Sequence, residues 1–150
     1  MKKILNTSND IVPFILRVGL GVVILPHGLQ KILGVFGGHG PQWTVDMWQQ
    51  WWGVPGFITW LVILGESIGM ICLILGLCTR IMSAALGIIM LGAVYLVHGQ
   101  FGFFMNWYSQ PGRGEGFEFH LLVFTIIIAL LIKGGGKWSV DLKLQEKIQS

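Results

Sequence analysis

The sequence predicts an all-α integral membrane protein, in which four membrane-spanning helices form a bundle and a tryptophan-rich helix lies on its outer face. Three observations predict this fold class. Charged residues make up 11% of the 150 residues, against about 25% in soluble domains, and the mean hydropathy is +0.70. Four apolar segments approach the roughly 20 residues that cross a bilayer. Basic residues gather near the ends of these segments.

The four predicted spans run through the chain, which we expect to form a single domain over residues 1–150. They cover residues 11–33, 57–77, 81–98 and 118–132. The first is predicted to be a retained span rather than a cleaved signal peptide, because Arg17 interrupts it and no Ala-x-Ala site follows. Residues 78–80 alone join the second and third spans, so these must be antiparallel neighbours, and Thr79 is expected to cap the third helix.

The distribution of lysine and arginine predicts the orientation of the bundle. Cytoplasmic loops carry an excess of these residues, and here most of them fall on the side of both chain ends. We therefore expect a multi-pass protein with both termini in the cytoplasm. The basic residues on the predicted cytoplasmic side are Lys2, Lys3, Arg80, Lys133, Lys137, Lys143 and Lys147, and those on the outer side are Lys31 and Arg113.

The first outer loop contains the segment WTVDMWQQWW, residues 43–52. At helical spacing its tryptophans gather near one face, while Asp46, Gln49 and Gln50 point elsewhere. This pattern predicts a helix that lies in the headgroup region, over the outer mouth of the bundle. A plain aromatic anchor is the alternative.

Two opposite charges are expected deep in the bundle. At about 1.5 Å of rise per residue, Arg17 lies about 9 Å from the cytoplasmic end of its span, and Glu66 lies near the middle of the second span. A charge at such depth costs about 2.5–3.5 kcal/mol on insertion scales. We therefore expect Arg17 and Glu66 to form an intramembrane ion pair, which either fixes the helix register or serves as a proton or ligand site.

A second group of ionisable residues is expected in one outer layer. His27 and His98 each lie about 25 Å from the inner ends of their helices, and Lys31 follows His27 by one turn. Glu118 and His120 begin the fourth span from outside. Three helices thus bring His27, Lys31, His98, Glu118 and His120 to a common level, where they are expected to line a ligand-binding pocket. Polar residues exposed at the membrane rim are the alternative.

The chemistry of this pocket stays open at the level of the residues. Lys31 and the histidines suit an anion, and they also suit the carbonyl groups of a quinone. No HxxxH or HxxE spacing supports a metal site, so none is expected. No catalytic residue can be assigned, and the net charge of +3 need not imply a nucleic-acid partner, because the basic residues follow the membrane topology.

Five segments of the sequence carry a family resemblance. They are LRVGLGVVILPHGLQKILG, GESIGMICLILGLCTR, HGQFGFFMNW, GEGFEFHLL and GGGKWSVDLK. In this order they resemble the DoxX family of small four-helix bacterial membrane proteins, over most of the chain. The resemblance implies a location in the bacterial inner membrane. The family-typical polar residues match Arg17, His27, Lys31, Glu66, Arg80, His98 and Glu118 here, together with the segment Phe103–Asn106.

The resemblance also implies a link to membrane redox chemistry. DoxX-like proteins are similar in hydropathy to a quinone-reducing thiosulfate oxidoreductase subunit, and others are linked to complexes that handle thiols and oxidative stress. A quinone or a sulfur anion is therefore the expected ligand, bound by a homo-oligomer or by a subunit of a membrane redox system. One alternative is a structural or assembly subunit without its own ligand. Another is a small-molecule transporter, although no inverted repeat or broken helix pair is evident in the sequence.

Overall fold

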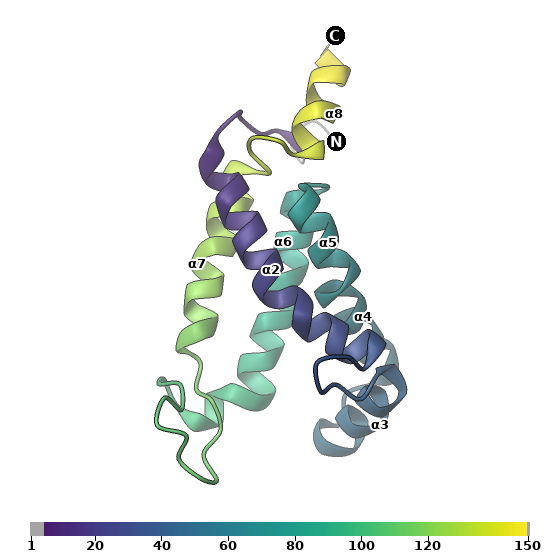
Figure 1. Ribbon diagram of the computed structural model, residues 1–150, viewed down its shortest axis with the longest axis vertical. Helices are drawn as coiled ribbons and strands as arrows, with labels where there is room; N and C mark the ends of the chain where they lie inside the picture. Colours follow the sequence, from purple (N-terminus) through teal and green to yellow (C-terminus); the bar gives the residue numbers. More distant parts are fainter. Residues whose placement is uncertain (1–4, 150) are drawn as a thin grey trace.

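The computed structural model describes residues 5–149, which fold into a helical bundle and contain no strand (Figure 1). The long helical segments are α2 (Ile11–Leu33), α4 (Gly56–Glu66), α5 (Ile68–Leu75), α6 (Thr79–Ala93) and α7 (Glu118–Lys133). Successive spans of the bundle run antiparallel, and α4 and α5 together form the second span. The start of α2 and the short helix α8 (Val140–Gln149) lie at one end of the bundle, here called the terminal end. The opposite end is called the loop end.

Three helical segments are long and apolar enough to cross a membrane. They are Ile11–Leu33, Gly56–Leu75 and Thr79–Phe101. These segments confirm the predicted membrane helical bundle. The fourth predicted span corresponds to α7, which packs against α2 and α6 but has 16 residues. At 1.5 Å per residue α7 is about 24 Å long, which is shorter than the roughly 30 Å hydrocarbon core.

The second span is irregular near its middle, and the third span is irregular toward the loop end. The second span is interrupted at Ser67, whose φ of −104° and ψ of −81° separate α4 from α5. The Ser67 hydroxyl donates to the carbonyl of Ile63 at 2.6 Å. The third span continues beyond α6 as a π-helical turn, Val94–His98, and a 3-10 turn, Gly99–Phe101. The break at Ser67 is not evident in the sequence, where residues 57–77 form one continuous apolar segment.

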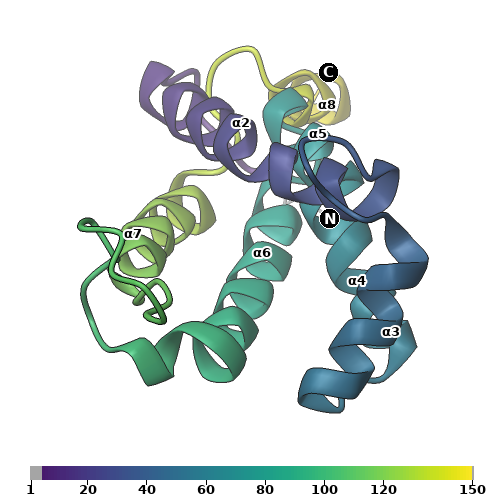
Figure 2. The same cartoon turned by 60° about the horizontal axis from the view of Figure 1, so that its bottom comes forward.

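The helices pack closely around one apolar core. Gly28 of α2 faces the α4–α5 break so closely that a Cβ there would lie 2.1 Å from the carbonyl oxygen of Glu66. This contact fixes the point at which the two spans cross. Figure 2 brings the loop end forward and shows α6 between α7 and the α3–α4 pair. The buried core residues are Leu20, Ile24, Met70, Leu73, Leu86, Met90, Val123, Ile127 and Leu130.

The predicted tryptophan-rich helix is present as α3 (Pro41–Trp52), which packs against α4 at the loop end. Pro41 begins the helix, and Gly53 ends it in the left-handed conformation with a φ of 65°. Trp43 and Trp51 are exposed, whereas Trp48 and Trp52 are half-buried toward the bundle. The tryptophans of α3 are therefore divided between an exposed surface and a surface that faces the bundle, rather than gathered on one face.

Arg17 is buried at the terminal end, where it binds main-chain carbonyl groups. Its Nε donates to the carbonyl of Gly135 at 2.9 Å, and its other nitrogens donate to the carbonyls of Leu73, Ile74 and Lys137. The last carbonyls of a helix lack partners within that helix, and the guanidinium fork satisfies those of α5. Arg17 therefore fastens α5 to the loop before α8.

The predicted cap of the third span is also replaced by a distant residue. The carboxylate of Asp141, which is 1% exposed, accepts hydrogen bonds from the backbone N–H groups of Cys78 at 2.7 Å and Thr79 at 2.8 Å. The hydroxyl of Thr79 has no partner in the described part of the chain. The prediction that Thr79 caps α6 is therefore wrong, because a carboxylate from α8 occupies the helix start.

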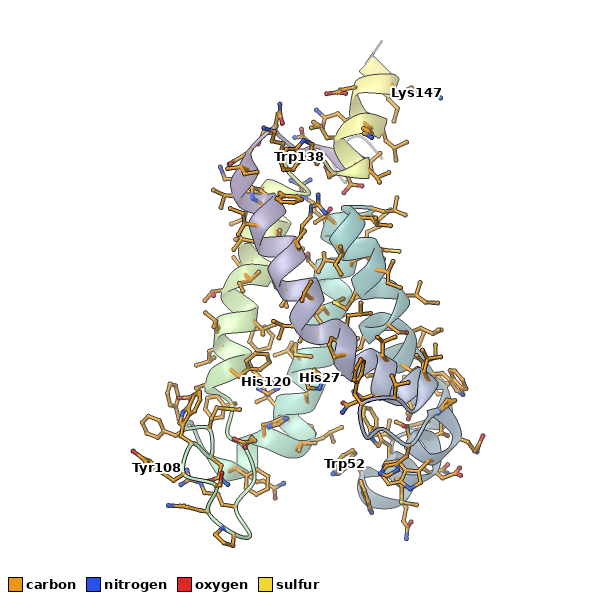
Figure 3. All side chains as sticks on the ribbon, viewed as in Figure 1. His27, Trp52, Tyr108, His120, Trp138 and Lys147 are labelled. Carbon is orange, nitrogen blue, oxygen red and sulfur yellow. The ribbon has the colours of Figure 1, made fainter. Side chains whose placement is uncertain are left out.

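The basic residues are distributed between the two ends as the sequence predicts. Arg80 lies in the first turn of α6, Lys133 ends α7, and Lys137, Lys143 and Lys147 follow, all at the terminal end (Figures 1 and 3). Lys31 and Arg113 belong to the loop end. Lys2 and Lys3 lie outside the described residues.

Candidate ligand-binding site

A cavity of about 350 Å³ lies between α2, α4, the π-helical turn and α7, toward the loop end, and it is called the polar cavity here because ionisable residues line it among apolar ones. Figure 3 shows His27 and His120 at a similar height in this region. Four of the five residues predicted for the pocket line the cavity, and Glu118 does not. Glu66, Met105 and Glu115 also line it. The ionisable lining residues are His27, Lys31, Glu66, His98, Glu115 and His120.

Lys31 and Glu66 form an ion pair at the cavity wall. Lys31 Nζ lies 2.5 Å from Glu66 Oε2, and the side chains are 20% and 8% exposed. The ammonium group also donates to the carbonyl of His27 at 3.3 Å and lies 5.9 Å from the ring centroid of Trp48. Because side chains of a helix point toward its N-terminus, Lys31 reaches back one turn to the crossing point at Gly28.

This ion pair corrects the prediction that Glu66 pairs with Arg17. Arg17 binds carbonyl groups at the terminal end, and Glu66 binds Lys31. Helix length alone places Glu66 between the two cations. The close contact of Gly28 with the backbone of Glu66 brings Lys31 within reach, and the sequence gives no direct signal of that contact.

His98 and His120 come together from different helices. Their ring centroids are 4.3 Å apart, with an interplanar angle of 45°. His98 Nδ1 lies 2.8 Å from the carbonyl oxygen of Glu115, and because a carbonyl oxygen only accepts, Nδ1 carries the proton. A neutral His98 then keeps an accepting lone pair on Nε2. The π-helical turn that ends at His98 is a type of irregularity that is frequent at functional sites.

His120 has the least satisfied polar atom of the cavity. The residue is 5% exposed, and its Nδ1 has no hydrogen-bond partner among the described residues. A buried polar atom without a partner costs about 1–3 kcal/mol, so most such atoms in folded proteins have one. His120 lines the cavity, and its buried nitrogen without a partner is therefore the clearest sign of a ligand there.

Glu118 and Glu115 support the loop that closes this end of the cavity. Glu118 Oε1 accepts a hydrogen bond from the indole of Trp107 at 2.6 Å, and Glu115 Oε2 accepts one from the backbone N–H of Asn106 at 2.5 Å. Glu118 thus acts as a loop anchor rather than a cavity residue. Sequence reasoning missed Glu115 as a cavity residue, because helix-depth arithmetic reaches only residues inside a helix and Glu115 precedes α7.

A second cavity of about 550 Å³ adjoins the first and is almost entirely apolar. It lies between α4 and α6, with α3 at the loop end. Lys31 and Glu66 line both cavities and are the ionisable residues of the second. Both volumes fall within the range of about 300–1,000 Å³ that is usual for small-molecule sites. Its apolar lining includes Trp52, Ile58, Leu61, Ala85, Ile88, Gly92 and Leu96.

The described residues contain no group of three or more His, Cys, Asp or Glu placed to hold a metal ion. Cys72 and Cys78 are unpaired and belong to the α5–α6 turn region at the terminal end, remote from the polar cavity. What the cavity offers is an ammonium group, a carboxylate and imidazole nitrogens. This set can bind a small molecule with several oxygen acceptors and can exchange protons with it near neutral pH.

Comparison with known proteins assigns the chain to a family. The DoxX family model matches residues 12–99, which is more than half of the chain, and the chain therefore belongs to the DoxX family. The matched region includes Arg17, His27, Lys31, Glu66 and His98.

A curated relative extends the similarity to most of the chain. The chain is 29% identical over 126 residues to the Bacillus subtilis (strain 168) protein named "Putative oxidoreductase CatD", which covers 84% of this chain and 83% of the relative. No solved structure matches the chain.

Proposed function

We propose that this DoxX-family protein binds a small redox-active molecule in the polar cavity, as part of a redox system of the bacterial inner membrane. The ligand is a quinone or a sulfur oxyanion. The observation that carries the proposal is the buried, unpartnered Nδ1 of His120, a residue that lines the polar cavity together with the Lys31–Glu66 pair. The printed name of the Bacillus subtilis relative, an oxidoreductase, supports the redox character of the ligand.

The donors of the cavity suit oxygen acceptors. The ammonium group of Lys31 has three protons, and two acceptors, Glu66 Oε2 and the carbonyl of His27, are within reach. One proton remains for a ligand oxygen. His120 supplies a second donor when Nδ1 is protonated. Two separated donors match the two carbonyl groups of a quinone, and they also match two oxygens of a sulfur oxyanion.

Proton exchange is the chemistry that these residues add to binding. A quinone takes up protons when it is reduced, and His98, His120 and Glu66 surround the cavity as groups that can hold or release a proton. The carbonyl of Glu115 keeps the His98 proton on Nδ1, so Nε2 is the atom that accepts. Electrons come from a partner in the same redox system, and the protein acts there as a subunit or as a homo-oligomer.

The orientation that we propose places the loop end outside and both termini in the cytoplasm, with α7 as the fourth span. The charge distribution supports it, because the basic residues of α8 and of the turns around Arg80 and Lys133 lie at the terminal end. In this orientation α3 lies at the outer surface, over the mouth of the apolar cavity.

The test is equilibrium binding to the protein in lipid nanodiscs, with empty nanodiscs subtracted. Two radiolabelled probes are used, dimethoxy-methyl-benzoquinone and thiosulfate. We expect saturable binding of one of them to the wild-type protein. His120→Leu should weaken this binding by about tenfold or more, because a buried hydrogen bond of about 1.5 kcal/mol is lost. The same variant should unfold no more readily than wild type, since it removes an unsatisfied buried nitrogen.

The matched control is His39→Leu, since His39 is exposed and lies outside the polar cavity. It should bind the probe as wild type does. Equal binding by wild type and His120→Leu, or saturable binding of neither probe, would contradict the proposal and favour a structural or assembly subunit.

A further inference from the structure

Resting on the proposed function, we infer that the ligand is an amphiphile whose polar head occupies the polar cavity and whose single hydrocarbon chain lies in the groove between α4 and α6. The groove is the apolar cavity described above. This assignment separates the two candidate ligands, because a sulfur oxyanion has no chain. It also gives the ligand a route into the site from the bilayer.

The continuity of the two cavities is the first argument. Lys31 and Glu66 line both, so the ion pair stands at the junction of a polar space and an apolar one. The polar space holds the histidines, and the apolar space is lined from Trp52 at the loop end to Ala85 on α6. A molecule with a polar head and an apolar tail matches this division of the lining.

The groove opens toward the membrane side of the bundle. Leu61 of α4 and Ile88 of α6 line it and are 61% and 72% exposed. Both residues lie inside segments that are long and apolar enough to cross a bilayer. A chain can therefore slide between the two helices from the hydrocarbon region, and no polar group has to cross the loop end.

Small residues of α6 keep the groove open. Gly92 lines it, and a Cβ built at Gly92 would meet no atom within 4 Å. Glycine inside a helix costs about 1 kcal/mol relative to alanine, and here no close helix contact requires it. The empty space beside Gly92 is explained if the chain of a ligand fills it. Gly19 of α2 also has open space around it, but it lines neither cavity.

This pair of glycines provides a matched test. Gly92→Phe is designed to place a ring in the groove, and Gly19→Phe adds the same ring on another membrane helix, at a position that lines neither cavity. The Cβ of either substitution meets no atom within 4 Å. Binding is measured in nanodiscs for dimethoxy-methyl-benzoquinone without a chain and for the same head with a decyl chain. Each value is corrected for partition into empty nanodiscs. Lipid tails are as apolar as the groove, so the chain gains affinity only through closer packing.

We expect the decyl probe to bind the wild-type protein about tenfold more tightly than the chainless probe, which corresponds to about 1.4 kcal/mol. Gly19→Phe should keep this ratio. Gly92→Phe should reduce it to about one, while the chainless probe still binds as it does to wild type. A ratio near one in the wild-type protein, or a ratio that Gly92→Phe leaves unchanged, would overturn the chain assignment.

His120→Leu separates the two proposals. If it weakens both probes while the ratio in wild type is one, the polar cavity binds the head and the groove is occupied by ordinary membrane lipid. If it weakens neither probe while Gly92→Phe weakens the decyl probe, the groove binds a chain but the head lies elsewhere, which overturns the joint site. A wild-type protein that binds neither probe contradicts both proposals.

Discussion

The stability contributions of Lys31 and Glu66 depend on one another, because each side chain neutralises the charge of the other and both are largely shielded from water. We predict that Lys31→Met and Glu66→Gln each lower the unfolding free energy by roughly 1–3 kcal/mol. This is below the 3–5 kcal/mol of fully buried pairs, since Lys31 is 20% exposed. The double variant should lose less than the sum of the two. Reversible unfolding in mixed micelles measures this coupling.

The same comparison of single and double variants, with Arg17→Gln in place of Lys31→Met, serves as the control. Arg17→Gln should be strongly destabilising by itself, because it removes the guanidinium that donates to the carbonyls of Ile74, Gly135 and Lys137. Its effect should add to that of Glu66→Gln within about 0.5 kcal/mol, as expected for sites without a shared partner. Coupling of Arg17 to Glu66, with none between Lys31 and Glu66, would restore the ion pair expected from the sequence and contradict the structure.

Residue depth was largely predictable, and residue pairing was not. Counting residues along each helix was enough to bring His27, His98 and His120 to one level. Pairing depends on where two helices cross, and here the crossing follows from the absence of a side chain at Gly28. Several other glycines in the predicted spans could permit such a contact equally well, so the sequence alone does not identify Gly28 as the crossing point.

At the scale of helices, Gly28 is the position that permits the close crossing of α2 with the α4–α5 break. We predict that Gly28→Ala lowers the unfolding free energy by about 1–3 kcal/mol, as overpacking does, because its Cβ would meet the backbone of Glu66. The bound probe should also be lost, since the shift separates Lys31 from Glu66. Thermal unfolding and nanodisc binding check the two effects.

Gly19→Ala is the matched control for this crossing. Its Cβ meets no atom within 4 Å, and alanine has the higher helix propensity. The variant should be as stable as wild type or slightly more stable. Equal destabilisation by both alanines would mean that helix propensity, rather than the crossing, determines the result.

The start of α6 depends on Asp141, which accepts two backbone hydrogen bonds there. We predict that Asp141→Ala costs about 0.5–2 kcal/mol of stability, as removal of helix caps does. A chemical readout accompanies it. Burial raises the pKa of the Cys78 thiol, and the Asp141 carboxylate raises it further, with a smaller contribution from Cys72.

Removal of the carboxylate should therefore lower the pKa of Cys78 part of the way, with burial still raising it. Because the thiolate is the reacting form, alkylation of Cys78 by iodoacetamide at a fixed pH should become faster in Asp141→Asn than in the parent. Both are measured with Cys72→Ala in the background. An unchanged or slower rate would show that the carboxylate does not act on Cys78.

The sequence predicted helices better than their irregularities. Hydropathy and length predicted α2 and α6, and the spacing of tryptophans predicted α3. The break at Ser67 was missed because an apolar segment of suitable length reads as one helix. The capping of α6 by Asp141 was missed because Asp141 is more than sixty residues from the start of α6 in sequence. Thr79 lies at that start and is a residue type that commonly caps helices.

At the scale of the whole molecule, the even number of proposed spans requires both chain ends on one side of the membrane. We predict that a green fluorescent reporter fused after Ser150 fluoresces, and that alkaline phosphatase fused at the same place is inactive. The same reporters inserted after Gly112, in the loop at the other end, should behave in the opposite way. Phosphatase activity at Ser150 alone would reverse the orientation, and activity at both sites or at neither would contradict α7 as a span.

The overall architecture was the most predictable feature of the protein. Composition and charge distribution predicted a membrane helical bundle before any contact was known. They could not predict the two adjoining cavities, because these arise from gaps between side chains of segments distant in sequence. The role of Glu66 at their junction follows from the same packing.

The central claim is that a ligand binds beside His120 in the polar cavity, and histidine-selective ¹⁵N NMR in nanodiscs tests it most directly. The four histidines are assigned with single His→Gln variants, and the decyl-benzoquinone probe is added stepwise. We predict saturable shifts of the His120 and His98 resonances, with the exposed His39 unchanged. A titration that leaves His120 and His98 unperturbed, or that moves all four histidines in proportion to the probe added, would contradict the claim.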